Sequence, residues 1–177
     1  KNDKVKEDYK FYLTLLNSSL MWFFLINTGT ELRGGFFRYK TKYLEPFPLP
    51  KLNSLDEQEP FVQKADLMLE LNKKLQETKQ NFINELDIEK IPKKLQNFEE
   101  LEFEGFVKEY KKAKKLKFAD KLEERNFKND WKALFENDKK EVQELQNQIN
   151  KTDKEIDKMV YKLYDLTEDE IKIVEGV

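Results

Sequence analysis

The chain has 177 residues, with 33 basic and 35 acidic side chains, five glycines, five prolines, no cysteine and no histidine. This composition excludes a Ser-His-Asp or Cys-His nucleophile, an imidazole acid–base catalyst, a disulfide scaffold and a zinc site of the usual nitrogen and sulfur ligands. Because 38% of the residues are charged and glycine and proline are few, long solvated helices are favoured, in one domain or in one domain with an appendage.

Charge is spread unevenly along the chain. Residues 1–50 carry a net charge of +3, residues 51–100 carry −3, residues 101–150 carry +1 and residues 151–177 carry −3. The near-neutral total therefore combines a basic head with an acidic tail.

The apolar runs are too short for a membrane span. The longest, Leu20 to Ile26, has seven residues, against the ~20 that a spanning helix needs. We therefore expect a soluble protein, and the absence of cysteine fits a reducing cytoplasm. The chain begins at Lys1 with no apolar signal core after it, so we expect a piece of a longer polypeptide without a targeting segment.

The first segment differs in composition from the rest. Residues 9–26 are apolar nearly all round, which predicts a helix buried against something large, with Gly29 as the left-handed residue past its end. Residues 32–49 are expected to be extended, with a turn at Gly34-Gly35. Proline at 46, 48 and 50 excludes a helix interior or a central strand there.

A helical period begins near residue 57. Asp56 can cap a helix over 57–87, and Pro60 is tolerated in its first turn. Its apolar stripe recurs by three and four: Phe61, Ala65, Met68, Leu71, Leu75, Phe82 and Leu86. A shorter helix is predicted between Phe98 and Lys115.

The clearest pattern lies between residues 122 and 165. Eight of the ten a and d positions of a heptad repeat are apolar, which predicts a coiled-coil helix. These positions are Trp131, Phe135, Asp138, Val142, Leu145, Ile149, Thr152, Ile156, Met159 and Leu163. The helices 57–87 and 122–165 would pair antiparallel most simply. Thr167 and Glu170 then form a capping box that starts a short terminal helix.

The predicted fold is therefore mainly α. An N-terminal helix and an irregular or short-stranded segment pack on a long antiparallel coiled-coil pair. Two regions are expected: residues 1–55, a globular part, and residues 56–177, the long-helix region with a C-terminal helix.

Catalytic motifs are weak in this sequence. Glu109-Tyr110-Lys111 and Glu170-Ile171-Lys172 match half of a magnesium nuclease motif, but no Pro-Asp precedes either, and such matches arise by chance in a chain rich in glutamate and lysine. Gly34-Gly35 lacks the spacing of a nucleotide-binding loop. We therefore predict no catalytic residue and no metal site.

Two basic stretches remain. The first is a lysine cluster that is either a solvated helix end or a nonspecific phosphate contact: Lys108, Lys111, Lys112, Lys114, Lys115 and Lys117. The second, residues 28–50, sets four cations among aromatic residues and glycines. Arginine forks, lysine charges and close glycine backbones suit DNA contact, although a loop that docks on the core explains the composition equally well.

Residues 13–50 and the C-terminus resemble a known family. The first motif is Leu13-x-x-Leu16-Asn17-Ser18 with the following Gly-Thr, Arg-Gly-Gly and Phe-Pro-Leu-Pro elements. The second is Ile156-Asp157-x-x-Val160-Tyr161-x-Leu163-Tyr164-x-Leu166-Thr167-x-x-Glu170-Ile171. Together they resemble the second half of the TaqI-like C-terminal specificity domain of type IIG restriction-modification enzymes and adenine-specific DNA methyltransferases.

The resemblance implies a target recognition domain that contacts double-stranded DNA and is braced by its long helices on a methyltransferase or nuclease part. S-adenosylmethionine and Mg²⁺ are implied for the parent enzyme, whereas no cofactor is expected in this fragment, which lacks the Asn-Pro-Pro-Tyr/Phe and glycine-rich motifs. The DNA-binding candidates are Thr30, Arg33, Gly34, Gly35, Arg38, Tyr39, Lys40 and Lys42. Two alternatives stay open: part of a type I specificity subunit, and a coiled-coil module for protein–protein interaction.

Overall fold

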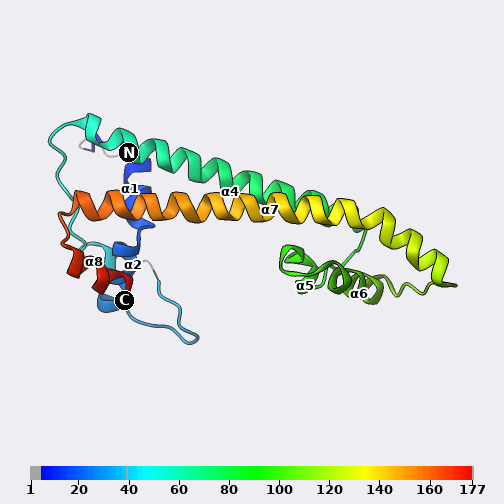
Figure 1. Cartoon of the computed structure of the whole chain (residues 1–177). Helices are drawn as coiled ribbons and strands as arrows, with labels where there is room; N and C mark the ends of the chain where they lie inside the picture. Colours follow the sequence, from blue (N-terminus) through cyan, green and yellow to red (C-terminus); the bar gives the residue numbers. More distant parts are fainter. Residues whose placement is uncertain (1–4, 39, 177) are drawn as a thin grey trace. The chain divides into compact units, whose positions relative to one another are not determined.

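The computed structural model describes residues 5–38 and 40–176. Over this part of the chain it contains helices and one isolated bridge but no strand, so the mainly α fold is confirmed. Two compact units are present: unit 1 is residues 1–69 with 150–177, and unit 2 is residues 70–149. The long helices α4 (Glu59–Glu85) and α7 (Lys121–Leu163) contribute to both units (Figure 1). The functional boundary expected after residue 55 stays a prediction.

Three helix segments build the core of unit 1. Helix α1 (Tyr9–Leu16) places Phe11 and Leu15 in one buried cluster with Phe61 at the start of α4 and with Ile156 and Val160 near the end of α7. Figure 1 shows α1 beside these ends of the two long helices. All five side chains are at least 94% buried. Burial of this apolar area is what holds the short α1 in place, since eight residues form no stable helix alone.

The apolar segment 9–26, predicted as one helix, forms two. Helix α2 (Ser19–Thr28) follows α1 at an angle of 62°. The break lies at Ser18, whose extended backbone and hydroxyl cap α2 by accepting from the amide of Met21, 3.3 Å away. Serine caps a helix start better than it continues a helix, so local chemistry overrides the continuous apolar pattern.

The prediction that Gly29 is left-handed is wrong. Its backbone is extended, with φ −82° and ψ −178°. The reason for glycine is space instead: a β-carbon here would lie 2.5 Å from the carbonyl oxygen of Leu25, and the Gly29 amide donates to that oxygen at 2.7 Å.

The segment expected to be extended is partly helical. A turn at Gly34-Gly35 is confirmed: Leu32 donates to the carbonyl of Phe36 at 2.7 Å, and the two glycines have φ of +95° and +79°. A short helix α3 (Thr41–Leu44) follows. Residues 46–50 are neither helix nor strand, as the three prolines predict.

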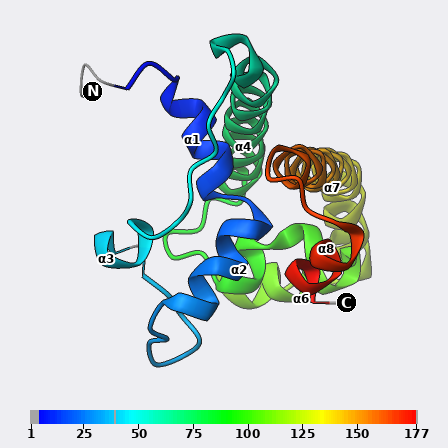
Figure 2. The ribbon, with the colours of Figure 1, turned by 90° about the vertical axis from the view of Figure 1, so that its left-hand side faces the viewer.

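The C-terminus folds back beside α2. Helix α8 (Glu168–Glu175) contacts α2 (Figure 2). The predicted capping box is confirmed, because the Thr167 hydroxyl accepts from the Glu170 amide at 3.4 Å and the Glu170 carboxylate accepts from the Thr167 amide at 2.8 Å.

Unit 2 has an aromatic core. Its short elements are α5 (Lys93–Gln96), a 3-10 turn (Phe98–Glu100) and α6 (Phe103–Lys114), so the predicted helix 98–115 is shorter and preceded by two turns. Phe82 of α4 stacks on Phe98 at 3.9 Å between ring centroids, and Phe106 of α6 stacks on Phe135 of α7 at 4.9 Å. Such aromatic pairs stabilise the core beyond what the burial of their apolar surface contributes.

The long helices pair antiparallel in each unit. In unit 1 Lys64 binds Glu155 at 2.6 Å. In unit 2 Lys74 binds Glu141 at 3.3 Å, and Phe82 lies 6.1 Å from Phe135 between ring centroids. None of the ten predicted a and d positions of α7 is exposed, which confirms the heptad register.

No single helix among the described residues is both long and apolar enough to cross a membrane. Only the bent pair α1 and α2 reaches the required length and apolarity, and only when the two are joined.

Candidate nucleic-acid interface

The loop between α2 and α3, residues 29–40, is closed at its base by side chains. The Thr30 hydroxyl and the Tyr43 phenol lie 2.6 Å apart and share a hydrogen bond. Phe37 meets Trp22 of α2 edge to face, with 5.5 Å between ring centroids. These contacts tie the loop to α2 and α3, and Figure 2 shows the course of its backbone between these two helices.

The chain after the loop is tied to α7. Phe47 is buried between Phe24 and Tyr164, 5.2 Å and 6.0 Å away between ring centroids. The Tyr164 hydroxyl donates to the carbonyl oxygen of Pro48 at 2.8 Å. Burial raises the pKa of Tyr164 to about 12, so this donor keeps its proton at neutral pH.

The four cations of the loop region point to solvent. Arg33, Arg38, Lys40 and Lys42 are all exposed, and no ion pair engages them within residues 5–38 and 40–176. Lys42 lies 4.6 Å from the centre of the Tyr43 ring. Free arginine and lysine heads on an anchored loop are available to an anionic ligand.

The remaining candidates have different places. Thr30 holds the base of the loop, so its hydroxyl is engaged rather than free. The positive φ of Gly34 and Gly35 places both in the turn at the loop tip, where other residues would be strained. Tyr39 lies outside the described residues.

The hydroxyl network at the loop base affects one ionisation. Hydrogen bonding to Thr30, helped by the neighbouring Lys42, lowers the pKa of Tyr43. The Tyr43 side chain is only partly exposed, and these contacts favour the ionised form of its phenol relative to free tyrosine.

The two sequence motifs meet in space. Asp157 accepts from the backbone amide of Ser19 at 2.7 Å and from the Ser19 hydroxyl at 2.6 Å. This carboxylate sits at the N-terminus of α2, where amides are unpaired and the helix dipole favours an anion. The Asn17-Ser18 break and the Ile156-Asp157 motif thus form one structural joint that orients α2 and its loop.

The two carboxylates that matched half of a nuclease motif have other partners in the structure. The described residues contain no group of three or more carboxylates that could hold a metal ion. The nuclease-like Glu109 binds Lys94 at 3.0 Å, and Glu170 caps α8. Both carboxylates have structural partners.

Sequence reasoning missed a second cationic surface. It identified lysines on α6 but not the α7 residues that face them: Lys121, Arg125, Lys128 and Lys132. The signal was present, because a spacing of four, three and four places all four on one helical face.

The fold is that of a mainly helical protein built on an antiparallel pair of long helices, with a basic loop anchored on its N-terminal helices. A family model described as a domain of unknown function (DUF8810) matches residues 54–160. The match covers more than half of the chain, and the chain belongs to this family. It spans α4 to α7 and leaves the basic loop outside. No curated protein and no solved structure matches the chain significantly.

Proposed function

We propose that the chain is the DNA sequence recognition part of a restriction-modification enzyme that methylates adenine, with or without DNA cleavage. In this proposal unit 1 presents the loop 29–40 and the start of α3 to double-stranded DNA. The fragment itself is noncatalytic, and S-adenosylmethionine and Mg²⁺ belong to the methyltransferase or nuclease part of the same polypeptide or complex.

One observation carries the proposal: Arg33, Arg38 and Lys40 are exposed and form no ion pair within the described residues, on a loop whose base is tied by side-chain contacts. Thr30, Tyr43, Phe37 and Trp22 fix the loop, while Arg33 and Arg38 flank the glycine turn. Direct base recognition needs side chains that reach from a fixed frame into a groove. The resemblance to TaqI-like specificity domains points to the same segment.

Salt-dependent binding of the whole chain to duplex DNA tests the proposal. The logarithm of the association constant should fall linearly with the logarithm of salt concentration, with a slope of roughly 0.9 per phosphate neutralised. Absent binding at low salt, or binding that salt leaves unchanged, would contradict it.

The alternative, a protein–protein interaction module, has support from one observation. Trp22 is 48% exposed and Ile26 is 41% exposed one turn further along α2, and paired exposed apolar residues suit a protein partner. The coiled-coil seam itself does not support this alternative, because its a and d positions are covered within the chain. The interaction module would be favoured if the chain binds no duplex DNA and if the Trp22→Ser substitution abolishes binding to a protein partner. A type I specificity subunit would give the same duplex result as the main proposal.

A further inference from the structure

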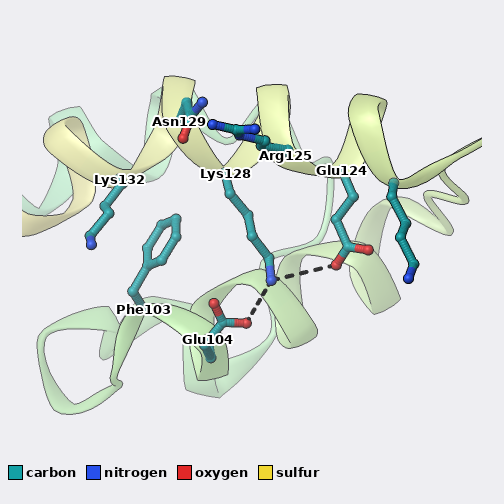
Figure 3. A pocket seen from close by; sticks show the side chains of 8 residues that line it. Phe103, Glu104, Glu124, Arg125, Lys128, Asn129 and Lys132 are labelled. Atoms are coloured by element: carbon teal, nitrogen blue, oxygen red, sulfur yellow. Dashed lines mark hydrogen bonds and ion pairs between the residues drawn. The ribbon is translucent and has the colours of Figure 1, made fainter.

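A groove in unit 2 runs between α6 and the first turns of α7 (Figure 3), lined by Phe103 and Glu104 of α6 and by a row of cations on α7. Further along α6, Lys108 and Lys111 follow Glu104 at spacings of four and three, and Lys115 caps the end of the helix with a left-handed backbone. The α7 wall carries, at spacings of four, three and four, Lys121, Arg125, Lys128 and Lys132. Residues at such spacings share one face of a helix.

Two ion pairs join the walls and show that both rows face the same groove. Lys128 Nζ lies 2.9 Å from Glu104 Oε2 and 3.5 Å from Glu124 Oε1, as the dashed lines in Figure 3 show. Lys111 Nζ lies 3.9 Å from Glu124 Oε1. Since Lys128 pairs with the start of α6 and Lys111 with the start of α7, the two helices run antiparallel.

Cations outnumber carboxylates in this groove. The two rows hold seven cations, and only Glu104 and Glu124 oppose them. Two further carboxylates lie at this end of unit 2: Asp120 accepts from two amides at the start of α7, and Glu123 accepts from the Ala119 amide.

Four of the seven cations are free to bind a ligand. Lys108, Lys115, Lys121 and Arg125 are exposed, and none forms an ion pair within the described parts of the chain. Lys132 is held only by Glu136 on its own helix, at 3.8 Å.

The shape of the rows favours a phosphodiester backbone over a peptide. The α7 row covers eleven residue steps, or about 16 Å along the helix axis. One DNA strand carries a phosphate every ~3.4 Å of duplex axis, so a row of cations faces a row of phosphates. Among the groove residues only Phe103 is apolar, whereas a protein partner would need an apolar core to its interface.

We propose that the α6–α7 groove is a second phosphate-binding surface for duplex DNA, distinct from the loop of unit 1. It binds the backbone without reading bases, because lysines act as point charges. The choice of duplex DNA as the ligand rests on the proposed function, while the surface itself lies wholly in unit 2.

Three matched variants of the whole chain test this proposal, with each removing three positive charges. The groove variant is Lys108→Gln, Lys121→Gln and Arg125→Gln. The loop variant is Arg33→Gln, Arg38→Gln and Lys42→Gln. The control variant is Lys151→Gln, Lys154→Gln and Lys158→Gln, exposed residues of α7 in unit 1 that make no ion pair in the described structure.

The measurement is fluorescence anisotropy with a labelled duplex over a range of salt concentrations. The groove variant should lower the salt slope by about 2 to 3, while the control variant keeps it. An unchanged slope in the groove variant would overturn the proposal. So would an equal loss in the control variant, or no duplex binding by the unmodified chain.

The loop variant separates this proposal from the proposed function. If the loop variant binds duplex as before while the groove variant has a smaller salt slope, the groove proposal is supported and the proposed role of the loop is contradicted. If only the loop variant has a smaller slope, the groove proposal alone is overturned. A charge-preserving variant, Lys108→Arg with Lys121→Arg and Arg125→Lys, should keep the slope. If the salt slope of this charge-preserving variant falls as much as that of the groove variant, disturbed folding explains the change and the proposal is wrong.

Discussion

Gly29 joins α2 to the basic loop at a point where the backbone leaves no room for a side chain. Gly29→Ala would bring a β-carbon to 2.5 Å from the Leu25 carbonyl, and we expect a loss of about 1–3 kcal/mol in the free energy of unfolding. Gly105→Ala is the matched control. Its β-carbon would have ordinary contacts at 3.9 Å inside α6, so it should stabilise by about 0.5–1 kcal/mol. Urea unfolding measures both, and a stable Gly29→Ala would contradict the account.

Asp138 is the charged residue of the coiled-coil seam. Burial raises its pKa, and Glu141 and Glu85 add to the effect. A raised pKa in the folded state means that stability is present at low pH and is lost as pH rises through that pKa. Asp138→Asn should therefore stabilise the chain by about 1 kcal/mol at pH 7 and by less at pH 3. Unfolding midpoints at the two pH values check this, and an equal gain at both would refute the role of the charge.

Two tyrosines, Tyr161 of α7 and Tyr164 just after its end, limit the stability of unit 1 at alkaline pH. Burial raises the pKa of Tyr161 and of Tyr164 to about 12 from 10. Since the folded pKa is the higher one, their contribution is complete below pH 10 and is lost between pH 10 and about 12. Tyr164→Phe should flatten the fall in stability over that window, although it also removes the bond to Pro48. Circular dichroism follows unfolding, and phenolate absorbance follows tyrosine ionisation. If all tyrosines ionise near pH 10 without unfolding, burial of Tyr161 and Tyr164 does not limit stability.

At the scale of elements, the joint between α7 and α2 depends on one carboxylate. Asp157→Ala removes both bonds to Ser19, and loss of such a cap costs about 1–2 kcal/mol. Asp153→Ala, one turn earlier on α7, should cost no stability at pH 7 and should stabilise slightly, because burial and the charge of Asp157 raise the pKa of Asp153. Thermal unfolding distinguishes the two. An equal effect of both variants would show that helix charge, rather than the cap, matters.

The long elements could be predicted because their signals are local and repeated. The heptad positions from Trp131 to Leu163 and the Thr167–Glu170 box agree with the structure. The break at Ser18 was missed because the apolar run continues across it. The second contribution, the bond from Ser19 to Asp157, joins residues 138 positions apart and could not be read from local sequence. The short helix α3 escaped prediction since its four residues carry no period.

At the scale of the whole molecule, the two units present separate cationic surfaces. The loop candidates could be identified from sequence because arginine, lysine and glycine cluster between residues 29 and 42. The contacts that fix the loop, Thr30 with Tyr43 and Phe37 with Trp22, could not, because they join residues that no short motif links. The α6–α7 groove could not be predicted from sequence either, because its two rows of residues meet only when α6 and α7 fold antiparallel to each other.

Sequence selectivity of the loop is the central claim, and one measurement tests it most directly. Duplexes selected from a randomised pool are compared with scrambled duplexes in binding to the chain, to Arg33→Ala and to Arg38→Ala. Both arginines are exposed, so folding should be unaffected. We expect a preferred sequence, and a loss of about 1–3 kcal/mol on that sequence for each variant with a reduced preference. The absence of any preferred sequence, or an equal loss on all duplexes, would contradict base recognition by this loop.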